Sequence, residues 1–529
     1  FLAVILSMTL MLTLGTAAFG AQKTLPSGKD TGSINVTNLK PGDTVTAYQF
    51  VKADYNEYGF TGYSAINNYV KDPVAPTAQE VIDMASNAAT MTVAAEKKVA
   101  TGDTEVTLNG LPVGYYLVMV TSGSETVYSP MIAGIYYSKS ATDNTLTNGA
   151  ISADSDFEIK AQKCWAKSST PKLEKTIVTP SSKNSKGDDI AIGDKITFNL
   201  SATVPSYSKE YKKVTYKIYD IMSEGLDYVD GSMKCFIEKY ENNRENIKVT
   251  PKVNGGIIEI TFDSKFILEH PGQKIQVEYQ AKLNEKAGVN FDANINKAYL
   301  EYSNNPASGS TAKTGEDKVY VYTFGIDSNL FGKSTEKWNE KTKELIKVEE
   351  GEYQWGETEK ESGIFTTTTA LEGATFTLTN NKTKKSYTAT SDKYGYLKFT
   401  GLDAGEYTLQ ETDAPDGFTL NDAKHTVVIK AEYNQDGTLK SYTIKIDDKA
   451  TSTYTATYDK GVIKTITSTK DSQGNISESA ILKNSKMSFL PSTGGVGTTI
   501  FAIVGVVFVA AALGLHMILR GKSKLEQDR

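Results

Sequence analysis

The chain has 529 residues, which is too many for one hydrophobic core, so we expect roughly two to four domains. Only 3 His and 2 Cys are present, which excludes a disulfide-stapled scaffold and an array of zinc sites. The net charge is −6, whereas a nucleic-acid-binding protein is more usually basic. The 30 Tyr residues and the frequent Thr residues favour strands, so the composition indicates a mainly β, multidomain protein.

An apolar run opens the chain and ends in small residues. Residues 1–14 have the length of the hydrophobic part of a secretory signal peptide, and several Gly and Ala residues follow. No initiator Met and no basic segment precede the run, so we expect the sequence to be truncated at its start. We interpret residues 1–21 as a signal peptide cleaved near Ala18 or Ala21, in preference to a buried helix.

A second apolar segment lies near the other end of the chain. Residues 498–519 contain no Asp, Glu, Lys or Arg, and as a helix they would span roughly 33 Å, enough for the core of a bilayer. Arg520, Lys522 and Lys524 follow directly, which puts the tail in the cytoplasm by the positive-inside rule. We therefore expect a C-terminal transmembrane helix with a basic tail.

A short motif precedes this apolar segment. It consists of Leu490, Pro491, Ser492, Thr493 and Gly494. The motif, the apolar segment and the basic tail, in this order, resemble the Leu-Pro-x-Thr-Gly sorting signal of Gram-positive surface proteins. In that family a membrane sortase cleaves between Thr and Gly with a cysteine thiol and passes the Thr acyl group to an amine. The resemblance implies that residues 487–529 are a sorting signal.

Three β-rich segments lie between the two ends, at residues 24–165, 168–322 and 323–486. The first alternates apolar and polar residues and contains one predicted helix, which begins after Thr77 because Thr77 and Glu80 have the spacing of a capping box. The other two contain strand-like runs separated by Gly, Asn, Asp and Pro turns, which is typical of β-sandwiches.

Several polar residues have the strand phase of core residues. Alternate positions of a sandwich strand face the core, and a polar group there is costly unless it is paired. The residues with inward phase are Lys175, Asp220 and Asn296 in the second segment, and Lys333, Glu411 and Asn484 in the third. The alternative for the lysines is a stem that runs along the core and exposes its amine.

An amine, a carboxylic acid and an amide buried together allow one kind of covalent chemistry. Burial lowers the pKa of a lysine and raises that of a carboxylic acid, because both charged forms are disfavoured away from water. The neutral amine can then attack the asparagine side-chain carbonyl. The acid donates a hydrogen bond to that oxygen and relays protons to the departing ammonia, leaving an amide that joins two strands.

Further motifs resemble those of the sortase-assembled backbone pilins of Gram-positive bacteria. Residues 407–418 resemble the E-box of that family, Tyr-x-Leu-x-Glu-x-x-Ala-Pro-x-Gly-Tyr, with Phe418 in place of the last Tyr. Residues 371–378 resemble the start of a collagen-adhesin B-type domain. The stretches that resemble the isopeptide-forming middle domain of the family are 171–175, 219–226 and 296–303.

This resemblance implies a fold of tandem immunoglobulin-like β-sandwiches of the collagen-adhesin A and B types. The cross-links that it implies are Lys175 to Asn296 with Asp220 as catalyst, and Lys333 to Asn484 with Glu411 as catalyst. It also implies a linker lysine that accepts the next subunit. The Tyr-Pro-Lys motif usual for that lysine is absent, so Lys167 is our first candidate and Lys163 the second.

The function that follows is that of a structural shaft subunit of a covalently polymerised surface pilus, not that of a turnover enzyme. Its partners would be a pilus-class sortase, identical subunits, peptidoglycan or a basal pilin, and host surface ligands, with no nucleic acid. No cofactor and no metal site is expected, since residues 434–437 resemble only part of a calcium loop and fit a hairpin turn.

Two other functions remain open at this stage. A monomeric wall-anchored adhesin would share the sorting signal but would need no linker lysine. A secreted hydrolase with β accessory domains is disfavoured, because His is scarce and no clustered carboxylate pair is visible in a cleft-forming domain.

Overall fold

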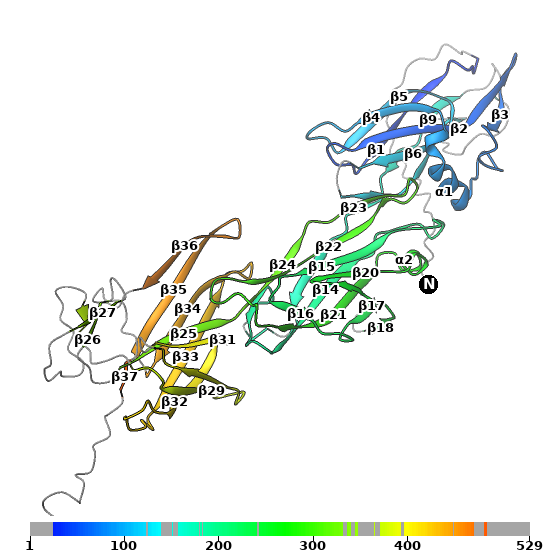
Figure 1. Ribbon diagram of the computed structural model, residues 1–529. Coiled ribbons are helices and arrows are strands. Elements are labelled where there is room, and N and C mark those ends of the chain that lie inside the picture. The colour runs from blue at the N-terminus through cyan, green and yellow to red at the C-terminus, as the bar shows by residue number, and fades with distance from the viewer. Residues whose placement is uncertain are drawn as a thin grey trace, which may run out of the picture.

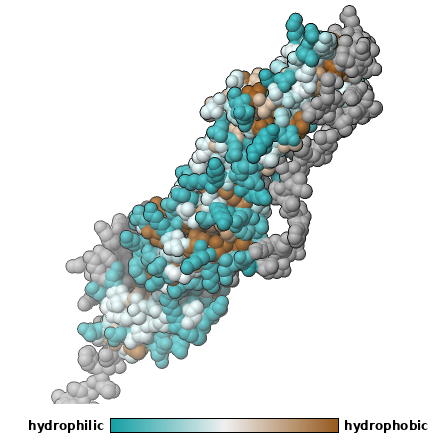
Figure 2. Space-filling view, turned by 90° about the vertical axis from the view of Figure 1, so that its right-hand side faces the viewer, coloured by the Kyte–Doolittle hydropathy of each residue, from teal (hydrophilic) through white to brown (hydrophobic). Residues whose placement is uncertain are grey.

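The computed structural model describes residues 25–122, 125–138, 151, 157–178, 180–181, 184–240, 243–331, 336–339, 344–347, 364–365, 371–392, 396–447, 449–469 and 481–483. These residues form three β-rich units arranged in a row (Figure 1). We call them the N-terminal unit (25–169), the middle unit (173–322) and the C-terminal unit (324–483). The visible face of the resulting rod is largely hydrophilic, with apolar residues gathered about half-way along it (Figure 2).

The N-terminal unit contains two larger sheets and one helix, which enclose two separate apolar cores. Its sheets have the orders β3-β2-β6-β8-β9 with β4 on β2, β10-β1-β5, and β11-β7. The strands are β1 Thr31–Thr37, β2 Thr44–Asn56, β3 Gly59–Ala65, β4 Val93–Lys98, β5 Glu105–Pro112, β6 Gly114–Thr121, β7 Val127–Tyr128, β8 Met131–Ser138, β9 Glu158–Ala161, β10 Cys164–Trp165 and β11 Ser168–Ser169.

The helix of this unit, α1 (Ala78–Ser86), begins at the predicted capping box and is followed by the 3-10 turn η1 (Ala88–Thr90). The Glu80 backbone N–H donates to the Thr77 hydroxyl, and the Glu80 carboxylate accepts from the Thr77 backbone N–H at 2.8 Å. Val81 and Met84 on the buried face pack against residues of β2 and β6, so the prediction of one helix on a sheet is confirmed.

The middle unit is a sandwich of two sheets. One has the order β12-β14-β21-β17-β18 with β16 on β21, and the other has the order β13-β24-β22-β15-β20-β19 with β23 on β22. The strands are β12 Leu173–Ile177, β13 Gly187–Asp189, β14 Lys195–Thr203, β15 Tyr216–Met222, β16 Leu226–Tyr228, β17 Lys234–Tyr240, β18 Asn243–Ile247, β19 Lys252–Asn254, β20 Ile257–Thr261, β21 Lys274–Leu283, β22 Asn294–Asn305, β23 Ser310–Lys313 and β24 Asp317–Tyr322. A short helix, α2 (Ser264–Glu269), connects β20 to β21 and is capped by the Asp263 carboxylate.

The C-terminal unit is built on a seven-stranded antiparallel sheet with the order β30-β29-β32-β33-β34-β35-β36. Two three-stranded sheets, β31-β25-β37 and β27-β26-β28, complete its described part. The strands are β25 Phe324–Phe331, β26 Glu336–Asn339, β27 Glu344–Lys347, β28 Ile364–Phe365, β29 Thr375–Asn380, β30 Ser386–Thr390, β31 Tyr396–Leu402, β32 Gly405–Asp413, β33 Lys424–Tyr433, β34 Leu439–Ile446, β35 Lys449–Asp459, β36 Val462–Thr469 and β37 Ile481–Lys483. The predicted turn at residues 434–437 joins β33 to β34.

The predicted signal peptide, sorting motif and transmembrane segment lie outside the described residues. Within the ranges that the structure covers, no helix has the length and apolar character needed to cross a membrane.

The N-terminal and middle units contact each other through apolar side chains. Ile82 of α1 and Val127 of β7 pack with the core of the middle unit. The Tyr302 hydroxyl of β22 donates to the backbone oxygen of Glu125. The chain therefore continues from the first core to the second through a packed junction.

The middle and C-terminal units make a closer contact, which is centred on β13. Ile192 donates its backbone N–H to the Gly401 oxygen at 2.9 Å. A Cβ atom on Gly187 would lie only 2.2 Å from the Gly437 oxygen, so the two backbones can approach only because position 187 has no side chain. The Asp189 carboxylate is buried between the units.

Asp189 holds this contact with both of its oxygens. Oδ1 accepts from the Ala404 backbone N–H, and Oδ2 accepts from the Tyr433 hydroxyl at 2.5 Å. Burial raises the pKa of Asp189 to about 6, although these two hydrogen bonds act in the opposite direction. The contact between the units thus contains a carboxyl group that holds its proton more tightly than an ordinary aspartate does.

We expect this carboxyl group to make the contact stronger in acid. Its pKa in the folded protein, about 6, lies above the ordinary 3.8, so the folded chain binds the proton more tightly than the unfolded chain. The resulting stabilisation is complete below about pH 4 and is lost as the pH rises through about 6. Asp189→Asn should reduce the fall in unfolding free energy between those pH values by on the order of 2–3 kcal/mol, measured by urea unfolding.

The exposed Asp227 of β16 provides a matched control, since Asp227→Asn should leave the pH dependence unchanged. An Asp189→Asn protein with the same pH dependence as the parent would contradict this assignment.

Candidate functional site

The middle unit brings Lys175, Asp220 and Asn296 together in its core. Lys175 lies on β12 of one sheet, and Asp220 and Asn296 lie on β15 and β22, which are neighbours in the facing sheet. In the register of these neighbours, Asp220 pairs with Ala298 and Met222 pairs with Asn296. Because each strand alternates buried and partly exposed residues, all three side chains point between the sheets and are 0% exposed.

A fourth residue, Tyr279 of β21, connects these three side chains. The Lys175 Nζ donates to Asp220 Oδ2 and, at 3.1 Å, to the Tyr279 hydroxyl oxygen. The Tyr279 hydroxyl donates to Asp220 Oδ1 at 2.7 Å, and Asn296 Nδ2 donates to the Tyr279 oxygen at 2.7 Å. The four groups form one hydrogen-bonded cluster in which Tyr279 is the common member.

This arrangement differs in one respect from the expected geometry. In the expected geometry the acid donates directly to the asparagine carbonyl. Among the described residues no hydrogen bond joins Asp220 to Asn296, and Asn296 Oδ1 is buried without a donor. The reason is positional, since the Tyr279 hydroxyl lies between them, donating to Asp220 and accepting from Asn296.

The surroundings of the cluster disfavour charge. Burial lowers the pKa of Lys175, and the neighbouring Asp220 carboxylate only partly opposes this effect. Burial also raises the pKa of Asp220, opposed in the same way by Lys175. The Lys175 Nζ lies 5.0 Å from the centre of the Phe198 ring and 5.3 Å from that of Tyr279. Both shifts favour a neutral amine beside a neutral acid.

The backbone of Lys175 is fixed from the outside by a second ion pair. The Lys175 N–H donates to Asp317 Oδ2 at 2.7 Å, and Lys186 Nζ donates to the Lys175 oxygen at 2.6 Å. Lys186 and Asp317 contact each other at 2.6 Å. These contacts hold the edge strand β12 in place where Lys175 enters the core.

The candidate site of the C-terminal unit lies only partly within the described residues. Glu411 of β32 is 2% exposed and faces inward with Tyr407 and Leu409. Its Oε2 accepts from the Asn421 backbone N–H at 2.6 Å. Lys333 and Asn484 are outside the described part of the chain.

The described strands nearest to these two residues are nevertheless paired. β25 and β37 run parallel, with Phe331 opposite Lys483. Phe331 precedes Lys333 by two positions in the sequence, and Lys483 directly precedes Asn484. The chain therefore approaches both predicted cross-link residues along adjacent strands.

The two candidate linker lysines lie in the last part of the N-terminal unit, shortly before the middle unit begins. Lys163 directly precedes β10, and Lys167 lies between β10 and β11; both side chains are exposed. The Lys167 backbone oxygen accepts from the Ser129 N–H at 3.0 Å. Trp165, which lies between the two lysines, is 71% exposed. The segment thus has a fixed backbone and accessible amines.

Other parts of the described chain do not form a competing chemical site. Cys164 and Cys235 are free and buried, and burial raises the pKa of each thiol to about 12. The described residues contain no group of three His, Cys, Asp or Glu side chains that could hold a metal ion.

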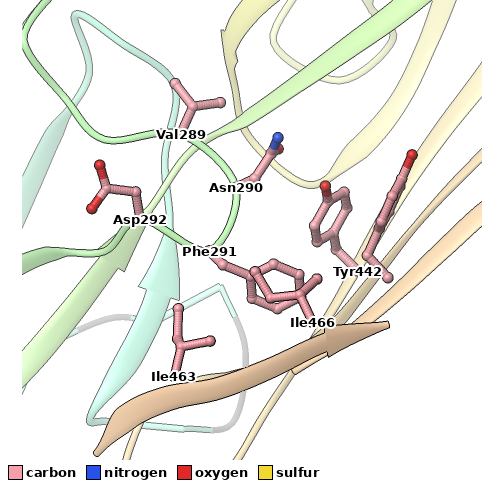
Figure 3. A pocket seen from close by; sticks show the side chains of 8 residues that line it. Val289, Asn290, Phe291, Asp292, Tyr442, Ile463 and Ile466 are labelled. Atoms are coloured by element: carbon pink, nitrogen blue, oxygen red, sulfur yellow. The ribbon is translucent and has the colours of Figure 1, made fainter. Parts of the chain in front are cut away.

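An open groove of about 420 Å³ lies between the loop 289–292 of the middle unit and the strands β34–β36. Figure 3 shows its largely apolar lining, which includes Phe291, Tyr442, Ile463 and Ile466. Its described lining does not pair a nucleophile with a base, so the groove is a feature of the contact between units and not a reaction site.

Tyr279 is the member of the hydrogen-bonded cluster that the sequence did not single out. It lies on β21 in phase with Ile275 and Val277, which indicates an inward side chain. An inward tyrosine in such a strand is usually a core residue, so only the contacts in the folded unit identify it as a member of the cluster.

Comparisons with known proteins agree with this architecture. Residues 29–168 match the T6 antigen Ig-like domain, residues 364–443 match the SpaA prealbumin-like fold domain, and residues 483–524 match the LPXTG cell wall anchor motif. The chain is 26% identical over 549 aligned positions to the trypsin-resistant surface T6 protein of Streptococcus pyogenes serotype M6, covering 94% of this chain and 96% of the relative. The chain is a backbone-pilin homologue.

A solved structure shows the same fold. The T6 backbone pilin of serotype M6 Streptococcus pyogenes superposes with a TM-score of 0.59 at 21% identity, covering 88% of this chain and 100% of that one. The mainly β fold of tandem domains expected for a pilin is therefore confirmed. The anchor motif assigns the pilin to the cell wall of a Gram-positive bacterium.

Proposed function

We propose that this pilin is a shaft subunit in which a sortase joins the Thr493 acyl group of one copy to a linker lysine of the next. Support comes from the match of the C-terminal residues to a cell wall anchor and from the similarity of nearly the whole chain to a surface T6 protein. Its partners are then a pilus-class sortase, identical subunits, and peptidoglycan or a basal pilin, with host surface ligands as further partners. The protein acts as a structural polymer unit, not as a turnover enzyme.

The acceptor amine is that of Lys167 or, second, that of Lys163. Both amines are exposed on a segment whose backbone is held by hydrogen bonds. A nucleophile on such a segment reaches the acyl-enzyme at a defined position without the cost of ordering a loop.

We further propose that Lys175 and Asn296 condense to an amide in the middle unit, with Asp220 as the acid. The observation that carries this proposal is the fully buried cluster of amine, carboxyl and amide groups, in which burial favours the neutral forms. The bond closes a loop of about 120 residues, which in the loop-entropy model stabilises the unit by about 5 kcal/mol.

An equivalent amide between Lys333 and Asn484, with Glu411 as the acid, is proposed for the C-terminal unit. The buried Glu411 carboxyl group and the parallel pair β25–β37 support it. The two proposed bonds form independently, because each acid lies in a different core.

Removal of either acid should abolish one bond and spare the other. Asp220→Ala leaves Lys175 and Asn296 in place but removes the proton carrier. The ectodomain of this variant should therefore be heavier, by one ammonia, than the mass calculated for the same variant with both amide bonds formed. Glu411→Ala should have the same effect through the C-terminal unit. Intact-mass spectrometry, followed by peptide mapping, identifies the bond that is missing, and the exposed Asp227→Ala serves as the control.

Each of these variants should also melt at a lower temperature and be cut by protease in the affected unit only. If Glu411→Ala loses as many ammonias as the parent protein, Glu411 is not the catalyst.

Polymerisation distinguishes a shaft subunit from a monomeric wall-anchored adhesin. Thr493→Ala removes the acyl donor, so the precursor should remain unprocessed in the membrane. Lys167→Arg keeps the charge but removes the amine nucleophile, so the high-mass ladders on denaturing gels should disappear while monomer stays attached to the wall.

The matched variant Lys163→Arg should keep the ladders. Ladders that depend on Lys163 instead would reassign the acceptor. Ladders that depend on neither lysine, or no ladders from the parent strain, would contradict the proposed linkage.

A further inference from the structure

The Tyr279 hydroxyl occupies the position between the acid and the nitrogen that must leave. It contacts Asp220 Oδ1 and Asn296 Nδ2 at 2.7 Å each, and Lys175 Nζ at 3.1 Å. We propose that Tyr279 is a catalytic residue in the formation of the amide bond. Its hydroxyl passes a proton from Asp220 to the departing nitrogen of Asn296. The inference rests on the Lys175–Asn296 bond proposed above.

The need for such a relay follows from the connectivity of the cluster. Both Asp220 oxygens are engaged, Oδ1 with Tyr279 and Oδ2 with Lys175. Asn296 Nδ2 gives its hydrogen bond to Tyr279. Within the described residues, the hydrogen-bonded route from the Asp220 carboxyl group to the amide nitrogen passes through the Tyr279 oxygen.

The direction of these hydrogen bonds changes during the reaction in the way that a relay requires. The nitrogen of a planar amide has no available lone pair, so before attack it can only donate, as it does to Tyr279. When the amine of Lys175 attacks Cγ, that carbon becomes tetrahedral and the nitrogen of Asn296 gains a basic lone pair. Tyr279 can then donate to it while accepting from the protonated Asp220.

The proton transfers balance over the whole reaction. Proton transfer from the Lys175 ammonium to the Asp220 carboxylate first gives the neutral pair, and the amine then forms the new C–N bond. The Asp220 proton moves to the Tyr279 oxygen as the Tyr279 proton moves to the nitrogen of Asn296, and the old C–N bond breaks to release ammonia. The new amide nitrogen returns its extra proton to Asp220, so Asp220 ends as the carboxylic acid of the neutral pair and Tyr279 ends unchanged.

The position of the tyrosine in the core supports a role beyond packing. The ring is fully buried, with its centre 5.6 Å from that of Phe198 and 5.9 Å from that of Tyr228. A phenylalanine would keep these ring contacts. The hydroxyl is the only part of the side chain that connects three reacting groups from both sheets.

The test is the rate of ammonia loss in the complete ectodomain with Tyr279→Phe. After a short pulse of expression, intact-mass spectrometry follows the fraction of protein that has formed the bond of the middle unit. We expect that bond to form about 100-fold more slowly than in the parent, while the C-terminal unit forms its bond at the parent rate. The matched control is Tyr228→Phe, which alters a neighbouring tyrosine outside the hydrogen-bonded cluster and should behave like the parent.

A second comparison separates chemistry from folding. Neither the single variant Asn296→Ala nor the double variant Asn296→Ala with Tyr279→Phe can form the bond. The difference between their melting temperatures therefore reports only the contribution of the Tyr279 hydroxyl to stability. Similar melting temperatures, together with slow bond formation in Tyr279→Phe, support the relay. If the middle unit of the double variant unfolds, the Tyr279 hydroxyl has a structural role, and this result would overturn the proposed proton relay.

The remaining outcomes distinguish the inference from the function on which it rests. Parent-like bond formation in Tyr279→Phe, with none in Asp220→Ala, overturns the relay and leaves the cross-link standing. A parent protein that never loses the ammonia of the middle unit overturns the proposed cross-link itself.

Discussion

The exclusion of water from one lysine and one aspartate is the constraint on which the middle unit depends. A buried pair of opposite charges pays a large desolvation cost, and removal of either partner leaves an uncompensated charge. The unit meets this constraint by surrounding Lys175 with aromatic rings and by giving Asp220 two donors. The environment that makes the charges costly is also the one that makes the amine nucleophilic and the acid able to donate. Stability and chemistry therefore have the same physical origin in this core.

Strand phase indicated that Lys175, Asp220 and Asn296 face inward, because a strand turns every second side chain to the same face, and the family resemblance then singled out these three. The same rule indicated that Glu411 is buried, which the structure shows. Phase could not identify Tyr279 as more than a core aromatic residue, since its role depends on which side chains of the opposite sheet its hydroxyl meets. The six residues of α2 were missed because so short a helix shows too little periodicity.

The contacts between units could not be predicted from the sequence, for a different reason. Asp189 lies in a short strand, and its partners Ala404 and Tyr433 are more than two hundred positions away. No local pattern indicates such pairings. The requirement for glycine at position 187 is equally invisible in the local sequence, because it arises from the close approach of the Gly437 backbone. These residues connect the cores into a continuous rod, so the middle and C-terminal units share hydrogen bonds and do not meet only at a linker.

The places of Lys175 and Asn296 along the chain have a mechanical consequence. Lys175 lies in the first strand of the middle unit, and Asn296 lies in β22, close to the point where the chain leaves toward the C-terminal unit. With the two side chains joined, tension that enters at β12 crosses directly to β22, and the residues between them carry none of it. Without the bond, pulling out those roughly 120 residues would lengthen each subunit by about 400 Å at 3.3–3.6 Å per residue. The amide that we propose would thus determine whether a fibre of many such subunits extends under load or keeps its length.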